Sequence, residues 1–185
     1  HSEHVARLAL ELFDATADRH GLGADARSLL EAAALLANVG LVISHGKHHK
    51  HSYYLIRNSD RLVGFTDQEI EVVAQIARYH RKSAPKASHP EWAALDDDDQ
   101  RTVLVGAAVL RVAIGLDRSH RQLVTGVDVD EVDGRLVLSV QTTEPDPDLS
   151  LELYAPVERS GLLVDVLGLP IDAVGAEPVP ATAAG

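Results

Sequence analysis

The chain has 185 residues, 45% of them hydrophobic and 24% charged, so it can bury a core and a largely disordered chain is excluded. This length suits one medium-sized domain, or one domain with an appendage. No apolar run approaches the roughly 18 residues of a membrane span, and the absence of cysteine excludes disulfides and zinc thiolate sites. Methionine is also absent and the chain starts at His1, which predicts a piece of a longer protein.

The net charge of −11 is unevenly distributed along the chain. Residues 1–90 contain 11 Lys and Arg against 10 Asp and Glu, whereas residues 91–185 contain 6 against 18. Nine of the ten histidines lie in the first stretch. Screening confines the repulsion from the acidic half to about 8–10 Å. We therefore expect any anion-binding site to lie in the first half.

Apolar residues recur at helical spacing through most of the first 120 residues. Gly21 and Gly40 end the first two predicted helices, and Thr66 with Glu69 predicts a capping box at the start of a later one. Between the second and third helices, residues 41–50 are expected to form a loop. The predicted helices cover residues 3–19, 25–38, 51–58, 66–82 and 96–118.

The period changes after residue 120. Alternating segments at 123–132 and 135–142 flank Asp133-Gly134, which predicts a hairpin. Leu149, Leu151 and Leu153 alternate again and predict a third strand, followed by a helix over 157–168. The fold class is therefore mainly α: a helical unit over 1–120, then a small α+β unit over 121–174 with an antiparallel sheet of three or more strands, then a flexible tail over 175–185.

The densest chemical feature is a run of histidines and lysines between Ser44 and Ser52. Three interpretations stay open: imidazoles that close on one metal ion, an anion cradle, or a solvated loop that caps the following helix. The two lysines weaken the metal interpretation, because their charges oppose a cation. The residues concerned are His45, Lys47, His48, His49, Lys50 and His51.

A second basic cluster, Arg78, His80, Arg81 and Lys82, stands at the end of a predicted helix. Cations there interact favourably with the helix dipole, which alone explains them. The functional alternative is phosphate recognition by a bidentate arginine. The spacing does not establish that the two clusters meet in space.

Four stretches carry a resemblance: HVARLALELFD (4–14), LVISHGKHHKHSYYLI (41–56), ARYHRK (77–82) and LRVAIGLDRSH (110–120). They resemble the C-terminal region of the Ppx/GppA family of exopolyphosphatases and guanosine pentaphosphate phosphohydrolases, and the resemblance extends to about residue 174. It implies an HD-like helical domain followed by a small α+β domain. It also implies that the catalytic site, with any divalent metal such as Mg, belongs to N-terminal actin-like domains absent from this sequence.

HD domains hold divalent metal with a His, an adjacent His-Asp pair and a later Asp. By resemblance, His4 matches the first position, Ala37-Asn38 the pair and Ile114 the last. Ala and Ile cannot ligate, and Asn offers only a neutral carbonyl, so we expect a degenerate site that holds no metal. Asp117 lies near the last position as a partial substitute.

The expected function is therefore a non-catalytic module that binds polyphosphate or guanosine polyphosphate through the ten residues of the two clusters. The resemblance also implies a cytoplasmic homodimer that contacts the N-terminal domains, with no cofactor in this fragment and no nucleic-acid or membrane partner. The parent protein is expected to hydrolyse phosphoric anhydrides, with this fragment inactive alone. The alternative is an HD-type metal-dependent phosphohydrolase that uses His4 and the histidines of 45–51.

Overall fold

The computed structural model describes residues 1–144 and 147–176. Its first part is helical, with α1 (Ser2–Ala15), α2 (Ala17–His20) and α3 (Ala24–Leu36). The single helix predicted over 3–19 is interrupted at Thr16, whose φ of −109° and ψ of 12° are not helical. The Thr16 hydroxyl donates to the Leu12 carbonyl at 2.8 Å, a local side-chain bond that competes with the helical ladder.

The next elements are a 3₁₀ turn η1 (Val39–Val42), α4 (His48–Arg57) and α5 (Asp67–Tyr79). The predicted capping box at Thr66 and Glu69 is confirmed, since each side chain bonds the backbone of the other. The loop predicted over 41–50 is only partly correct, because α4 already begins at His48. The short α6 (Pro90–Ala93) and the long α7 (Asp97–Leu116) follow, and Asp96 caps α7 by accepting from the Asp99 amide at 2.8 Å.

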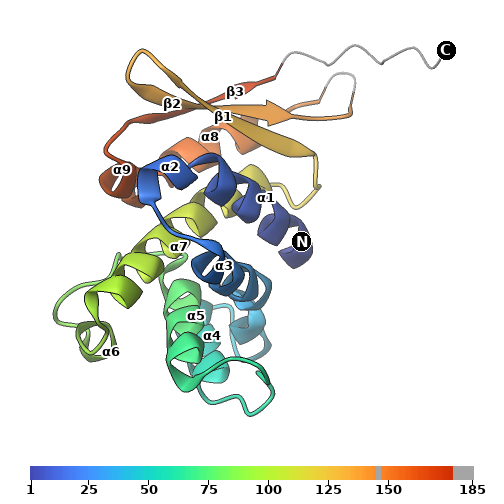
Figure 1. Ribbon diagram of the computed structural model, residues 1–185. Helices are drawn as coiled ribbons and strands as arrows, with labels where there is room; N and C mark the ends of the chain where they lie inside the picture. The colour runs from blue at the N-terminus through green and yellow to red at the C-terminus, as the bar shows by residue number, and fades with distance from the viewer. Residues whose placement is uncertain (145–146, 177–185) are drawn as a thin grey trace.

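The remaining elements are β1 (Gly126–Val132), β2 (Arg135–Gln141), α8 (Ser150–Glu158), α9 (Gly161–Leu167) and β3 (Ile171–Gly175). The predicted hairpin is confirmed: β1 and β2 pair antiparallel, and Asp133 and Gly134 both have positive φ, as a tight two-residue turn requires. The three strands form one sheet in the order β1-β2-β3 that lies above the helices in Figure 1.

Two expectations for this part were wrong. The alternating leucines at 149–153 belong to the helical segment around α8, where Leu149, Glu152 and Ala155 are the buried positions at helical spacing. The third strand is instead β3, which pairs parallel to β2, so the sheet is mixed and not wholly antiparallel. A helical crossover through α8 and α9 returns the chain in the same direction, which makes the pairing parallel.

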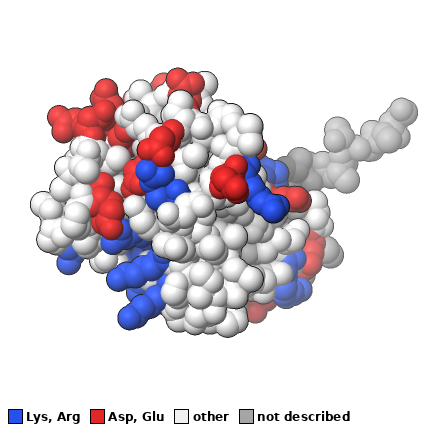
Figure 2. All heavy atoms as spheres, turned by 90° about the horizontal axis from the view of Figure 1, so that it is seen from below, with Lys and Arg blue, Asp and Glu red and all other residues white. Residues whose placement is uncertain are grey.

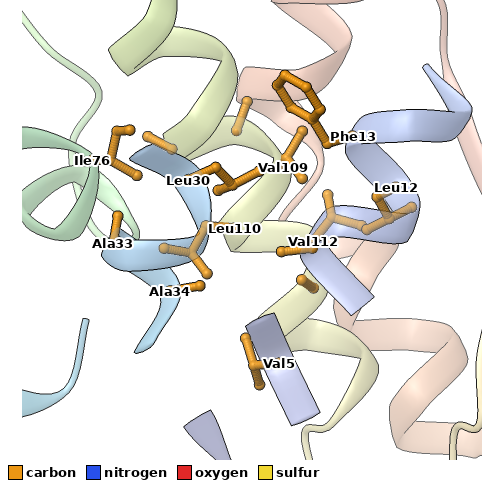
Figure 3. Close-up of a cluster of buried hydrophobic side chains, with 14 of the residues drawn as sticks. Val5, Leu12, Phe13, Leu30, Ala33, Ala34, Ile76, Val109, Leu110 and Val112 are labelled. Carbon is orange, nitrogen blue, oxygen red and sulfur yellow. The ribbon is translucent and has the colours of Figure 1, made fainter. Parts of the chain in front are cut away.

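Helix α7 lies at the centre of the core, with α1, α3 and α5 around it and α8 and α9 also in contact (Figure 1). Figure 3 shows Val109, Leu110 and Val112 of α7 among apolar side chains from α1, α3 and α5. One buried cluster joins side chains from both predicted units, and the boundary at residue 120 stays a prediction. Gly175 ends β3, and residues 177–185 of the predicted tail lie outside the described residues. No helix in the described part of the chain has the length and apolarity to cross a membrane.

Candidate anion-binding site

The histidine-rich segment is held by a close approach between η1 and the start of α4. A Cβ at Gly40 would lie 2.3 Å from the His48 carbonyl oxygen, so only glycine fits. The Ser52 hydroxyl accepts from the Gly40 amide at 2.9 Å and donates to the Ala37 carbonyl at 2.7 Å. Lys47 stands before the helix in the left-handed region, with φ of 58°. These contacts direct His48 and His49 inward, and each is 8% exposed.

His48 contacts His80, which follows α5. The two basic clusters of the sequence therefore meet in the fold. The two Nε2 atoms are 3.4 Å apart, His80 Nδ1 lies 2.5 Å from the Ala77 carbonyl oxygen, and Arg81 Nη1 lies 3.1 Å from His48 Nδ1. One proton assignment satisfies these contacts: Arg81 donates to His48 Nδ1, His48 Nε2–H donates to His80 Nε2, and His80 Nδ1–H donates to Ala77. The 3.3 Å contact between His48 Nδ1 and the His45 carbonyl then carries no proton.

Burial keeps these imidazoles neutral. It lowers the pKa of His80 to about 3 and the pKa of His49 to about 4, and the neighbouring cation Arg81 acts in the same direction on both. The pKa of His48 is also lowered, mainly by burial. Among the hydrogen-bonded side chains Arg81, His48 and His80, Arg81 therefore carries the positive charge.

Beside these hydrogen-bonded side chains lies a pocket of about 660 Å³, here called the main pocket. Five cationic side chains line it, together with His1, His48, His80 and His120, and Glu158 is the one carboxylate in its lining. Within the described residues none of the five cations has a carboxylate oxygen within 4.0 Å. The cations are Arg81, Lys82, Arg111, Arg118 and Arg159.

Three of these cations come from the acidic half of the sequence, whereas an anion site was expected to lie within the first half. Arg111 on α7 reaches the end of α5 and donates to the carbonyls of Tyr79 at 2.8 Å and Lys82 at 3.0 Å. Arg118 follows α7, and Arg159 follows α8. A Cβ at Gly115 would lie 2.6 Å from the Pro156 nitrogen, so α7 and α8 cross closely enough to bring Arg159 to the pocket.

The electrostatics of the main pocket favour an anion. Burial lowers the pKa of Arg111, and the nearby Arg159 lowers it further. Burial followed by the charge of Arg118 lowers the pKa of Arg159, whose buried Nε has no hydrogen-bond partner in the described chain. Glu158 acts in the opposite direction on Arg159, but one carboxylate faces five cations, and a bound anion would reduce the remaining repulsion between them. Figure 2 shows Lys and Arg side chains gathered toward the lower left of the face seen from below.

Two residues at the pocket rim have backbones in the left-handed region that L side chains rarely adopt. Lys82 has φ of 65° and His120 has φ of 59°. The His120 ring stacks on His1 at 4.0 Å between centroids, and His1 Nδ1 lies 2.6 Å from a carboxylate oxygen of the buried Asp117. Such backbone conformations carry strain and recur at functional sites.

Three other predicted residues line a second, smaller hollow of about 60 Å³, here called the side hollow. Its lining includes His49, Lys50 and Arg78, and it shares Arg81 with the main pocket. Of the ten predicted site residues, four therefore line the main pocket and three line only the side hollow. The remaining three line neither hollow: His45, Lys47 and His51.

The positions assigned by resemblance to an HD metal site are only partly brought together. Asn38 and Ile114 both line the main pocket, whereas Ala37 is buried and holds Ser52 through its carbonyl. His4 is not in the lining; Arg7 Nη2 lies 3.3 Å from its Nδ1, and burial lowers the pKa of His4. Among the described residues no three His, Asp or Glu side chains form a group able to hold a metal ion. Of the positions assigned by resemblance, Ala37 and Ile114 carry no metal-ligating atom in their side chains.

Sequence reasoning missed five pocket residues: Arg111, Arg118, Arg159, His1 and His120. Arg118 and His120 follow a predicted helix, where a dipole contact is the ordinary explanation of basic residues. Arg111 and Arg159 are single arginines within amphipathic segments, and no local pattern distinguishes them from solvated surface residues.

Comparison with known proteins finds relatives over most of the chain. Residues 1–146 match the family model described as Ppx/GppA phosphatase, domain III. A guanosine-5'-triphosphate,3'-diphosphate pyrophosphatase of Vibrio vulnificus (strain YJ016) is 32% identical over 165 residues, which is 86% of this chain and 32% of that protein. The protein of the same name from Vibrio parahaemolyticus serotype O3:K6 (strain RIMD 2210633) is 32% identical over 163 residues, with the same coverage.

A further relative of the same name, from Pseudoalteromonas translucida (strain TAC 125), is 38% identical over 58 residues, or 31% of this chain and 12% of that protein. The chain thus spans about a third of the length of the Vibrio relatives that it matches over most of its own length. The family match covers more than half of the chain. The chain therefore belongs to the Ppx/GppA phosphatase family.

Proposed function

We propose that this chain is the non-catalytic, polyanion-binding C-terminal region of a Ppx/GppA-type phosphohydrolase, with inorganic polyphosphate or guanosine polyphosphate as its ligand. One observation carries the proposal: five cations without carboxylate partners in the described chain converge on the main pocket, where Glu158 is the one acidic residue. The printed names of the relatives point to a guanosine polyphosphate, and the parent protein would hydrolyse phosphoric anhydrides in domains other than this one.

The chemistry of the lining suits phosphoryl oxygens. Arginine presents several N–H donors in a planar fork and stays charged at any physiological pH, so Arg118 and Arg159 can each bond two oxygens of one phosphate. Arg159 has an unused Nε–H for this purpose. An anion in the pocket would also favour protonated His48, because it opposes the cations that lower the pKa of that ring.

A hydrolytic HD centre is not part of this proposal. Ala37 and Ile114 offer no ligand at two of the expected positions, and Asn38 offers only a neutral oxygen. Any divalent metal, Mg included, is assigned to the catalytic domains of the parent protein. We also propose that the chain forms a homodimer, contacts those domains and works in the cytoplasm. Light scattering of the chain at high micromolar concentration tests the dimer, and a monomer there contradicts it.

Isothermal titration of the chain with inorganic polyphosphate at low salt tests the binding function. We expect Arg118→Ala to weaken binding by about 10-fold or more, since a hydrogen bond to a charged group contributes about 1.5–3 kcal/mol. Arg61→Ala is the matched control: it removes one exposed arginine that lines neither hollow. Binding should fall steeply with added salt, by analogy with other polyanions. No heat with polyphosphate or guanosine pentaphosphate, or equal loss in the two variants, would contradict the proposal.

Two assays on the same protein test the enzymatic alternative. Metal analysis and a phosphatase assay with Mn²⁺ are expected to be negative. Bound metal together with turnover that His4→Ala abolishes would replace the binding proposal with the HD-type phosphohydrolase.

A further inference from the structure

We propose that the side hollow is a separate subsite for a single phosphoryl group, so that a ligand is held at two places with Arg81 between them. This inference rests on the proposed function, because it assigns the main pocket to the remaining phosphates of the same ligand. It goes further in requiring a ligand with at least two phosphoryl groups. Arg81 lines both hollows and lies 3.1 Å from His48 on the side of the main pocket.

A residue that lines the side hollow has a buried imidazole nitrogen without a hydrogen-bond partner in the described chain. His49 lines it and is 8% exposed, and its Nδ1 is buried with no hydrogen-bond partner in the described chain. An unsatisfied polar atom in a folded interior is unfavourable by roughly 1–3 kcal/mol, so such atoms are rare without a ligand or water to meet them. In the neutral tautomer that carries its proton on Nδ1, His49 would donate this proton to a phosphoryl oxygen.

A second imidazole adds a donor to the same hollow. The Tyr79 hydroxyl lies 2.8 Å from His89 Nδ1, and the Lys86 amide donates to that nitrogen at 3.3 Å. His89 Nδ1 is therefore an acceptor, so the neutral ring carries its proton on Nε2. Within the described residues that Nε2 takes part in no hydrogen bond. Ser83 also lines the hollow.

The size and charge of the side hollow fit one tetrahedral oxyanion. Its volume of about 60 Å³ is several times the roughly 10–15 Å³ that admits a single water, so it has room for one small oxyanion. Lys50, Arg78 and Arg81 supply positive charge, and no Asp or Glu is among the lining residues. Glu91 bonds Arg78 at 3.1 Å from outside the lining, so it offsets part of this charge.

A phosphate series measured by isothermal titration tests the subsite. We expect affinity to rise by about 10- to 100-fold from orthophosphate to linear polyphosphate, because the longer ligand adds charge-assisted bonds in the side hollow. Ser83→Asp adds a carboxylate to the lining of that hollow and should remove this gain. The matched control is Ser88→Asp, in the same exposed loop but outside the lining, which should keep most of the gain.

The outcomes separate this inference from the proposed function. Equal polyphosphate affinity in Ser83→Asp and Ser88→Asp would overturn the subsite, while the main pocket would still account for the binding. Absence of binding to the unchanged protein would overturn both. As a direct readout, the imidazole ¹⁵N signals of His49, assigned with His49→Gln, should move when polyphosphate is added; unmoved signals at saturation would also contradict the subsite.

Discussion

The main pocket and a hollow beside the sheet have similar volumes and opposite charge. The hollow between α1 and the β1–β2 hairpin, here called the sheet hollow, has a volume of about 730 Å³ and contains no Lys or Arg among its described lining residues. Its carboxylates include Glu11 and Asp14, which are paired with Arg7 and Arg27 outside the lining. The two hollows thus differ in the sign of the charges that line them, so the net charge of −11 describes neither of them.

The largest expected effect comes from reversing one charge on each side. Arg81→Glu should weaken polyphosphate binding by about 100-fold or more, because it removes a cation shared by both hollows and adds a repelling carboxylate. Asp128→Lys, in the sheet hollow, should change affinity by less than about 3-fold at physiological salt, where screening limits distant charges. Titration calorimetry compares the two. Tighter binding in Asp128→Lys by 10-fold or more would show that the anion uses the sheet side.

A smaller effect should follow from disturbing the contact that brings Arg159 to the pocket. Gly115→Ala places a Cβ within 2.6–2.8 Å of backbone atoms of Ala155 and Pro156, so α7 and α8 must separate. We expect a loss of about 1–3 kcal/mol in the free energy of unfolding, measured with urea, together with weaker polyphosphate binding. Gly175→Ala, in β3, meets no atom within 4 Å and is the control. Unchanged stability in Gly115→Ala would show that α7 and α8 do not pack this closely at Gly115.

The third expected effect is a pH dependence that originates on the pocket side. The unfolded chain protonates its histidines near pH 6.5, whereas folded His49 and His80 stay neutral down to pKa values of about 4 and about 3. Acid therefore favours the unfolded chain, and stability should fall by about 1 kcal/mol per pH unit for each of the two histidines between pH 6 and pH 4.5. Urea unfolding at several pH values measures this slope. His49→Gln should make this slope shallower by about 1 kcal/mol per pH unit, and an unaltered slope would show that His49 does not contribute to it.

The secondary structure near Thr66 and Leu149 illustrates what local sequence can and cannot predict. The capping box at Thr66 and Glu69 needs only residues three apart, so the start of α5 was predicted correctly. The alternating leucines at 149–153 fit a strand by period, but contact with α7 makes the segment around α8 helical. Strand β3 was missed because its five residues carry no strong pattern and depend on pairing with β2.

The sequence by itself determined the mainly helical class, the hairpin at Asp133-Gly134, and the two basic clusters as the residues to follow. These features depend on local preferences and on residue type, which a single chain displays directly. Only the tertiary structure decided that His48 meets His80, that Arg111, Arg118 and Arg159 join them from the acidic half, and that the basic residues divide between two hollows. The close crossings at Gly40 and Gly115 bring these segments together. Contacts between residues far apart in sequence depend on how whole elements pack, which no local spacing encodes.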